Sequence, residues 1–395
     1  MDIRFSENTE PLRPSAIREI FKSLTDPSVI SFAAGNPSPL CFPSEQFRQF
    51  CGEILESDPA AALQYGITEG YTPLRQALLK RCRTRFGIGG DGDSVIVTTG
   101  GQQGIDLTAK VLCNRGDTVI CEEPTFIGAL NAFRAHGCKA AGVPMRGASI
   151  DPDELEAVIK RAERPKLIYL IPTFQNPTGR TMPEDVRAAC LRIAEKYGLL
   201  ILEDNPYGEL RFSGEDVPTI KSMDKDGRVI YCSSFSKILS PGIRVGYVIC
   251  RDDVASKIAV CKQVNDVHTN QLMQMVCHRF MTDFDLDAHI KRITRVYREK
   301  AALMIGALDE SCGGVIEYTR PEGGLFIWAW LPALKDHDGF VKALAAKKLA
   351  VVPGSTFSCT AGAPSAGFRL NYSMPADDMI IKGVEILKDT AKEFI

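Results

Sequence analysis

Small hydroxyl and cationic side chains follow one apolar run of the sequence closely. The run Val229–Cys232 has the composition of a buried strand. After it come Ser233, Ser234, Ser236, Lys237 and Arg244. An amine inside such an anion-binding cluster can act as a nucleophile toward a carbonyl carbon. A lysine at a strand end is commonly a surface residue, and it is the neighbours of Lys237 that favour a reactive role.

A second anion site is predicted at the turn Gly100–Gly104, which follows the apolar run Val95–Val97. A strand, a glycine turn and a helix start leave free backbone N–H groups at the helix N-terminus, where a phosphate binds. A dinucleotide-binding fingerprint fits poorly, because Thr99 stands where its first glycine is needed. A glycine-rich turn without any ligand stays open at this point.

An acid and an amide follow two further apolar runs. Asp204 comes after Leu199–Leu202, and Asn176 follows Leu167–Pro172. A carboxylate at the end of a buried strand is costly unless a cation meets it, although a structural ion pair or a helix cap would also explain Asp204, and a turn would explain Asn176. Together with the lysine and two phosphate-compatible turns, the acid indicates pyridoxal phosphate, which needs an amine, an anion cradle and a carboxylate at its ring nitrogen.

These polar groups stand at the ends of short apolar runs that alternate with helical patterns. The runs are Val95–Val97, Thr118–Cys121, Leu167–Ile171, Leu199–Leu202, Val229–Cys232 and Val245–Ile249. Runs that are apolar on both faces, separated by helices of crossover length, predict a mainly parallel sheet covered by helices. The fold class is therefore α/β, in which ligands gather at the carboxyl ends of the strands.

A second unit is predicted in the last part of the chain. Apolar residues at helical spacing indicate a long amphipathic helix over Asp287–Leu308. Strands at Gly324–Trp330 and Leu349–Val352, and a final helix from Pro375, then indicate a smaller α+β unit.

Length and charge argue against several classes of function. The 395 residues carry 47 Lys+Arg and 49 Asp+Glu, a net charge of −2, which disfavours nucleic acid as the main partner. No run approaches the roughly 18 apolar residues of a membrane span, and no secretory signal opens the chain. We therefore expect a cytoplasmic protein. The 13 cysteines include no Cys-x-x-Cys pair, and no two histidines stand at metal-ligand spacing, so we expect no disulfide framework and no bound metal.

Motifs over nearly the whole chain resemble those of the fold-type I pyridoxal-phosphate aminotransferases of class I and II, and within them the branch of the 2-aminoadipate and kynurenine aminotransferases. They are Ser31–Pro37, Leu63–Gly66, Gly100–Gly104, Asn176–Gly179, Asp204–Tyr207, Ser234–Lys237, Gly242–Gly246, Pro321–Phe326 and Phe368–Leu370. The resemblance implies a large α/β domain at residues 50–285 with a mainly parallel seven-stranded sheet flanked by helices. A smaller α+β domain would comprise residues 1–49 and 286–395.

The resemblance also implies a role for each matching residue. Lys237 would form the internal aldimine with the cofactor, and Asp204 would pair with the protonated pyridine nitrogen. The other cofactor contacts would come from Gly101, Gln102, Ser234, Ser236 and Arg244 at the phosphate, Phe126 on the ring face, and Asn176 and Tyr207 at the ring hydroxyl oxygen.

Substrate contacts and a partner subunit follow from the same resemblance. Arg369 matches the arginine that grips the substrate α-carboxylate with the help of Asn176, and Gly35 and Arg18 are assigned to the substrate side of the site. For Arg18, a solvent-facing helix position stays open. Tyr65 matches a tyrosine that reaches the phosphate of the other subunit, so a homodimer is expected.

The expected reaction moves an amino group from an α-amino acid to a 2-oxo acid in a ping-pong sequence, with Lys237 carrying the Cα proton. A carbon–sulfur lyase or a decarboxylase stays open, because the same cofactor chemistry serves both. A non-enzymatic sensor is a third reading, disfavoured because only about 30 residues precede the Ser31 motif, too few for a DNA-binding domain. Which amino acid is preferred does not follow from the sequence.

Overall fold

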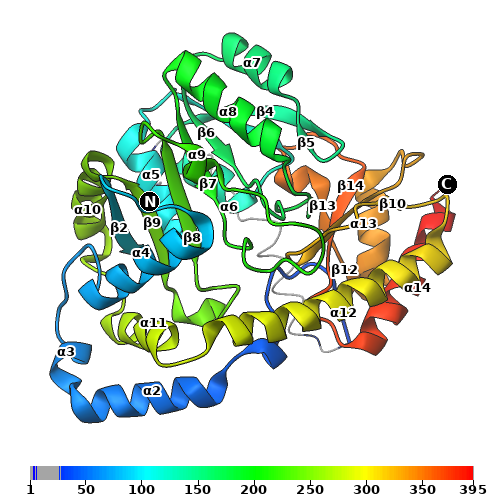
Figure 1. Ribbon diagram of the computed structural model, residues 1–395. Helices are drawn as coiled ribbons and strands as arrows, with labels where there is room; N and C mark the ends of the chain where they lie inside the picture. Colours follow the sequence, from blue (N-terminus) through cyan, green and yellow to red (C-terminus); the bar gives the residue numbers. More distant parts are fainter. Residues whose placement is uncertain (1–2, 5, 7–25, 27, 395) are drawn as a thin grey trace.

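A central sheet forms the larger part of the computed structural model, which describes residues 3–4, 6, 26 and 28–394 (Figure 1). Its strands are, in spatial order, β2 (Asp93–Thr98), β9 (Gly246–Arg251), β8 (Val229–Ser234), β7 (Leu200–Asp204), β6 (Pro165–Leu170), β3 (Thr118–Glu123), β4 (Lys139–Arg146) and β5 (Ser149–Ile150). Neighbouring strands from β8 to β4 are parallel, whereas β9 is antiparallel to β2 and β8, and β5 to β4. The predicted mainly parallel α/β sheet is confirmed.

The sheet is eight-stranded rather than seven-stranded, because the two-residue β5 extends it beyond β4. Each of the six apolar runs coincides with one strand of this sheet, namely β2, β3, β6, β7, β8 or β9, although Ile171, Leu199 and Val245 lie one residue outside the observed strands. The sequence analysis missed β4. This strand is largely exposed or half-buried and contains Pro144, so it lacks the continuous apolar run of a central strand.

Helices cover both faces of the sheet because neighbouring strand residues point to opposite sides and are apolar on both. Leu167 and Leu202 pack in a cluster with α5 (Gly101–Leu112), α6 (Ile127–Ala135) and α10 (Asp252–Asp266). Ile168 and Ile201 pack in another with α7 (Pro152–Arg161), α8 (Glu184–Tyr197) and the short α9 (Ile220–Met223). The largest cluster includes α2 (Ser44–Ser57), α4 (Thr72–Phe86) and α11 (Gln271–Thr282), with α3 (Pro59–Leu63) beside them.

A smaller α+β unit follows, as predicted. Its sheet has the order β10 (Glu317–Tyr318), β11 (Phe326–Trp330), β14 (Gly367–Asn371) and β13 (Val352–Pro353), with all pairs antiparallel. The strand predicted over 349–352 is interrupted at Val351: its first part, β12 (Leu349–Ala350), pairs instead with β1 (Ile30–Ser31). Helices α13 (His337–Ala346) and α14 (Asp377–Glu393) complete the unit.

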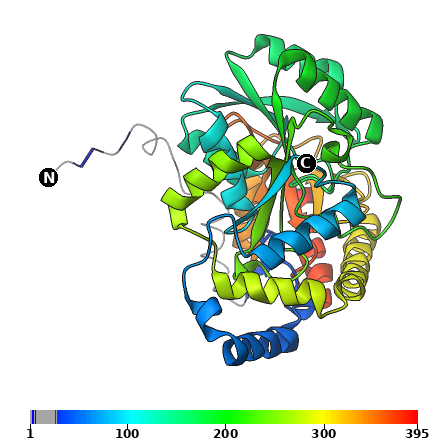
Figure 2. The same ribbon diagram turned by 60° about the vertical axis from the view of Figure 1, so that its left-hand side comes forward.

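One long helix connects the two parts of the chain. The helix predicted over 287–308 is α12 (Leu286–Cys312), and the side chain of Asp285 caps it by accepting a hydrogen bond from the Ala288 N–H. Figures 1 and 2 show α12 running from the end of α11 to the smaller unit, where it packs on α14. The predicted boundary at 285/286 coincides with the start of α12, and that at 49/50 falls inside α2; the domain division stays a prediction.

Among the described residues, no helix is long and apolar enough to cross a membrane.

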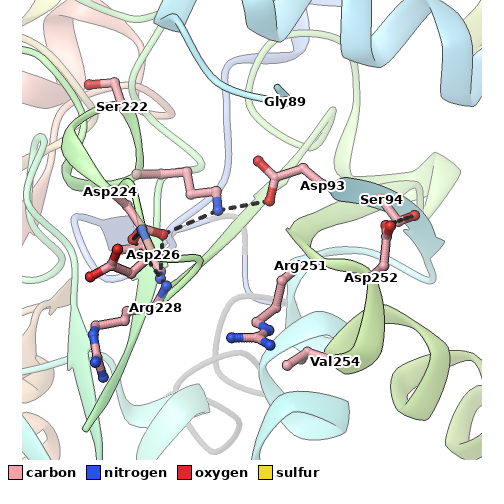
Figure 3. Close-up of polar contacts among 12 residues, drawn as sticks. Gly89, Asp93, Ser94, Ser222, Asp224, Asp226, Arg228, Arg251, Asp252 and Val254 are labelled. Atoms are coloured by element: carbon pink, nitrogen blue, oxygen red, sulfur yellow. Dashed lines mark hydrogen bonds and ion pairs between the residues drawn. The ribbon is translucent and has the colours of Figure 1, made fainter. Parts of the chain in front are cut away.

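A buried ion-pair cluster lies at the end of the central sheet where β2 and β8 begin. The ammonium group of Lys221 contacts Asp93 Oδ1 at 2.9 Å and Asp224 Oδ2 at 3.3 Å (Figure 3). The Lys221 side chain is 3% exposed, and Asp224 also accepts hydrogen bonds from the Arg228 and Val229 N–H groups. The cluster therefore connects α9, the start of β2 and the turn before β8.

We expect Lys221→Met to lower the free energy of unfolding by about 3 kcal/mol, because it leaves two partly buried carboxylates without their cation. The matched control is Lys225→Met, since Lys225 is an exposed residue of the same segment and its loss is expected to cost less than about 0.5 kcal/mol. Urea denaturation of both variants at saturating cofactor measures the difference. Equal midpoints for the two variants would contradict a stabilising role for the cluster.

Candidate active site

One cavity of about 270 Å³ lies where the carboxyl ends of the central strands meet the smaller unit. Its lining includes most of the residues assigned from sequence: Gly35, Gly101, Gln102, Phe126, Asn176, Asp204, Tyr207, Ser234, Ser236, Lys237, Arg244 and Arg369. The fold brings these positions together because β6, β7 and β8 are parallel neighbours that end at the same edge.

Lys237 supplies the amine of the cavity. It follows β8, and its Nζ donates a hydrogen bond to the Gly35 carbonyl oxygen at 2.8 Å and lies 5.8 Å from the centre of the Tyr207 ring. Burial, together with the nearby guanidinium groups of Arg369 and Arg244, lowers the pKa of Lys237 to about 8. About a tenth of the amine is therefore neutral, and so nucleophilic, at pH 7.

Asp204, the last residue of β7, supplies the carboxylate. Its Oδ2 accepts a hydrogen bond from the Tyr169 hydroxyl at 2.7 Å, and Oδ1 has no hydrogen-bond partner among the described residues. Burial raises the pKa of Asp204 to about 6, while the Tyr169 hydrogen bond and the charge of Lys237 oppose that rise. The carboxylate is ionised at neutral pH and keeps one oxygen for a ligand.

Arg369 supplies a buried guanidinium from the middle of β14. Its Nη1 donates to Asn176 Oδ1 at 2.8 Å and its Nη2 to the Ala33 carbonyl oxygen at 2.7 Å, and its Cζ stands 4.2 Å from the centre of the Phe326 ring. Its Nε has no partner among the described residues. Burial lowers the pKa of Arg369 to about 10, so the group stays charged at neutral pH, and Nη1 and Nη2 each keep a second N–H for an anion.

The anion-binding turn is shaped by close approach of Arg244. Gly100 has φ +76°, and a Cβ there would lie 2.3 Å from Arg244 Nη2, so only glycine leaves room for the guanidinium. Arg244 Nη2 donates to the Thr99 carbonyl oxygen at 3.2 Å. The N-terminus of α5 begins at Gly101, and Ser234 Oγ accepts a hydrogen bond from the Ser236 N–H at the same cavity. The arrangement concentrates positive potential at one end of the cavity.

A hydrogen-bonded network connects that turn to α10. Asp266 accepts hydrogen bonds from Thr99 Oγ1 and Gln103 Nε2, each at 2.7 Å. Lys262, whose side chain is fully buried, donates to Asp266 and to Gln103 Oε1. The sequence analysis placed Gln103 in the glycine turn and did not identify this network.

Of the other two assigned residues, Tyr65 does not line this cavity. Tyr65 is 80% exposed, and its ring contacts His268 edge-on, with ring centres 5.8 Å apart. Arg18 lies outside the described residues.

The sequence analysis also missed three aromatic side chains at the site. Phe326 and Phe357 flank the Arg369 guanidinium, and Tyr169 donates to Asp204 from below the cavity. Phe326 ends the motif Pro321–Phe326 and could have been found there. Tyr169 stands inside an apolar strand, where a tyrosine is an ordinary core residue, so nothing local distinguished it.

Comparisons with known proteins agree with this site. Residues 27–382 match the family model for aminotransferase class I and II. Aromatic-amino-acid aminotransferase 1 of Thermococcus litoralis is 39% identical, over 98% of this chain and 94% of that protein. The 2-aminoadipate transaminase of Thermus thermophilus is 37% identical, over 97% of this chain and 95% of that protein.

A solved structure extends the likeness to three dimensions. The kynurenine aminotransferase of Pyrococcus horikoshii, determined with PMP, superimposes with a TM-score of 0.94 at 37% identity, covering 98% of this chain and 97% of that one. These are aminotransferases, and they lend no support to the lyase alternative. The chain belongs to the class I and II aminotransferases, pyridoxal-phosphate enzymes of fold type I, as its motifs predict.

Proposed function

We propose that this cavity transfers an amino group from an α-amino acid to a 2-oxo acid by a ping-pong sequence, with Lys237 as both the cofactor attachment point and the proton carrier. One observation carries the proposal. A buried amine, a buried carboxylate and a buried guanidinium, those of Lys237, Asp204 and Arg369, line the same cavity. Transamination requires these groups for the cofactor aldehyde, the ring nitrogen and the substrate carboxylate respectively.

The residues present fit pyridoxal phosphate. Asp204 Oδ1 accepts no hydrogen bond from the part of the chain that the structure describes, and it would be available to the pyridine nitrogen. Gly101 and Gln102 at the start of α5, with Ser234, Ser236 and Arg244, form the positive end of the cavity that would hold the phosphate. Phe126 would cover one face of the ring, and Asn176 and Tyr207 would contact its hydroxyl oxygen. When bound, this group supplies an aldehyde that reacts with amines and a ring that accepts the electron pair of Cα.

The lysine can move a proton because its environment disfavours its charged form. Burial and two neighbouring cations lower the pKa of Lys237 to about 8, near neutral pH. The neutral Lys237 amine would accept the proton from the substrate Cα. The resulting ammonium would then donate that proton to a carbon of the cofactor. Lys237 thus acts as general base and then as general acid.

Arg369 would orient the substrate. A guanidinium that keeps a second N–H on Nη1 and on Nη2, and that Asn176, Ala33 and two aromatic rings already fix, binds a carboxylate with little loss of side-chain freedom. Gly35, whose carbonyl oxygen accepts the Lys237 hydrogen bond, lies on the same side of the cavity. Fixing the α-carboxylate sets the direction of the Cα–H bond toward the lysine.

The described lining does not offer a further cation for a second substrate carboxylate, because Lys237, Arg244 and Arg369 all have a role. We therefore propose that Arg18 is the residue that decides between dicarboxylic and apolar donors. A donor panel with 2-aminoadipate and phenylalanine, run on the wild type and on Arg18→Ala, identifies the preferred amino acid.

A homodimer is part of the proposal, and an exposed apolar patch supports it. The exposed apolar residues stand in two segments of the chain: Leu63, Tyr65 and Ile67 in one, Val264 and Val267 in the other. The Tyr65 ring contacts His268, which follows Val267 in the sequence. Contiguous exposed apolar side chains of this kind mark association surfaces. In a dimer, Tyr65 would reach the phosphate of the partner subunit. We also assign the protein to the cytoplasm, a reducing compartment that suits its thirteen unpaired cysteines.

Lys237→Ala is expected to fold, to lose the cofactor on dialysis, and to turn over about 10⁴-fold more slowly, because attachment and proton transfer both depend on the amine. Borohydride reduction followed by peptide mapping locates the attachment at residue 237 in the wild type and finds none in the variant. Lys382→Ala, an exposed change on α14, serves as the control with wild-type values. A reduced adduct at another lysine would overturn the assignment.

Arg369→Lys is expected to raise the KM for phenylalanine about a hundredfold, because a lysine cannot make two parallel hydrogen bonds to a carboxylate. Phenethylamine lacks that carboxylate, so its kcat/KM should change much less. The ratio of the two kcat/KM values, measured in wild type and variant, isolates carboxylate recognition. An unchanged ratio would show that another group binds the carboxylate.

Tyr65→Phe is expected to weaken pyridoxal phosphate binding about tenfold, the effect of one lost hydrogen bond to a charged group. Equilibrium dialysis measures the affinity, and analytical ultracentrifugation measures the dimer. Tyr318→Phe, in the smaller unit, is the control. A monomeric enzyme with full cofactor affinity would contradict the role of Tyr65.

A further inference from the structure

Tyr169 is a buried polar residue in contact with the site but outside the cavity lining. It lies on β6 with no exposed surface, and its hydroxyl donates to Asp204 Oδ2 at 2.7 Å. The roles assigned above to the cavity residues do not include it.

The Tyr169 ring is fixed in place by its surroundings. Its strand pairs with β7 so that Tyr169 stands beside Leu202, two residues before Asp204. From α6, Phe133 contacts the ring at 73°, with centres 5.5 Å apart. A rigid aromatic ring held between a strand and a helix presents its hydroxyl at one position, which preorganises the hydrogen bond to Asp204.

Asp204 has few other groups to hold it. Tyr169 is the single hydrogen-bond donor to this carboxylate among the described residues. Asp204 also interacts electrostatically with four other titratable groups, those of Lys237, Tyr207, Cys232 and Glu122. Lys237 is the cation of this set.

We propose that Tyr169 is a positioning residue that keeps the Asp204 carboxylate ionised and holds it with Oδ1 toward the pyridine nitrogen. The inference rests on the proposed function, because that function assigns Asp204 to the ring nitrogen. Tyr169 itself touches neither cofactor nor substrate.

The inference has a definite pH signature. Burial raises the pKa of Asp204 to about 6, and the Tyr169 hydrogen bond acts against that rise. Losing this donor raises the pKa further, so at a given pH a smaller fraction of the carboxyl is ionised. Because a protonated carboxyl must lose its proton to pair with a protonated pyridine nitrogen, ligand affinity falls about tenfold for each pH unit below that pKa.

The test measures binding of pyridoxamine phosphate to the full-length enzyme between pH 5 and 8, by equilibrium dialysis. This probe makes no covalent bond to Lys237, so its affinity reports on non-covalent recognition. In Tyr169→Phe we expect the acidic fall in affinity to begin about one to two pH units higher than in the wild type, the effect of one hydrogen bond to a charged group. The affinities should converge at pH 8.

Three further variants make the result decisive. Tyr247→Phe removes another buried hydroxyl of the same sheet, one that does not contact Asp204, and should leave the pH profile unchanged. Asp204→Asn should remove the acidic fall. If Tyr169→Phe binds with the wild-type profile while Asp204→Asn loses it, the role of Tyr169 is refuted and the proposed function stands.

If Asp204→Asn also keeps the wild-type profile, the assignment of Asp204 fails, and with it the proposed function.

Should Tyr169→Phe alone prove unstable, the double variant Tyr169→Phe/Asp204→Asn is compared with Asp204→Asn. Identical pH profiles support action through Asp204, and a difference between them overturns it.

Discussion

Removal of water from ionisable groups is the constraint on which this site depends. Lys237, Asp204 and Arg369 are all buried in one place, and burial disfavours the charged form of each. The fold offsets this cost with hydrogen bonds placed one by one: Gly35 for the lysine, Tyr169 for the acid, Ala33 and Asn176 for the arginine.

The anion-binding end of the cavity depends on the backbone conformation of the glycine turn. The approach of Arg244 to the turn leaves no space for a side chain at Gly100, and the turn is held from behind by Asp266 with Lys262. Positive charge at this end of the cavity is therefore fixed before any ligand arrives. Preorganised donors cost no rearrangement on binding, which favours tight retention of a phosphate.

Much of this architecture could be predicted from the sequence, because strand-end polar residues and apolar runs report directly on a parallel sheet. The runs around Leu167 and Val229 became central strands, and the residues that follow them converge on one cavity. The prediction was incomplete where the local pattern is uninformative. Strand β4, next to the short edge strand β5, has no apolar run, and Val351 splits a strand that reads as continuous.

The partners of the site residues were harder to predict than the residues themselves. Tyr169 has the type and setting of a core residue, and only the position of β6 beside β7 places its hydroxyl on Asp204. The carbonyl oxygens of Ala33 and Gly35 leave no trace in a sequence, since every residue has one. Identity of a side chain is local information, whereas its neighbours depend on the whole topology.

The residues that follow β1 determine at what stage of folding the site is completed. Gly35 and Ala33, near one end of the chain, bind Lys237 and Arg369, and the latter stands on β14, near the other end. Such contacts close very long loops, which form late in folding. A nascent chain can complete the central sheet, yet it has no working centre until β14 has been synthesised and has met the segment that follows β1.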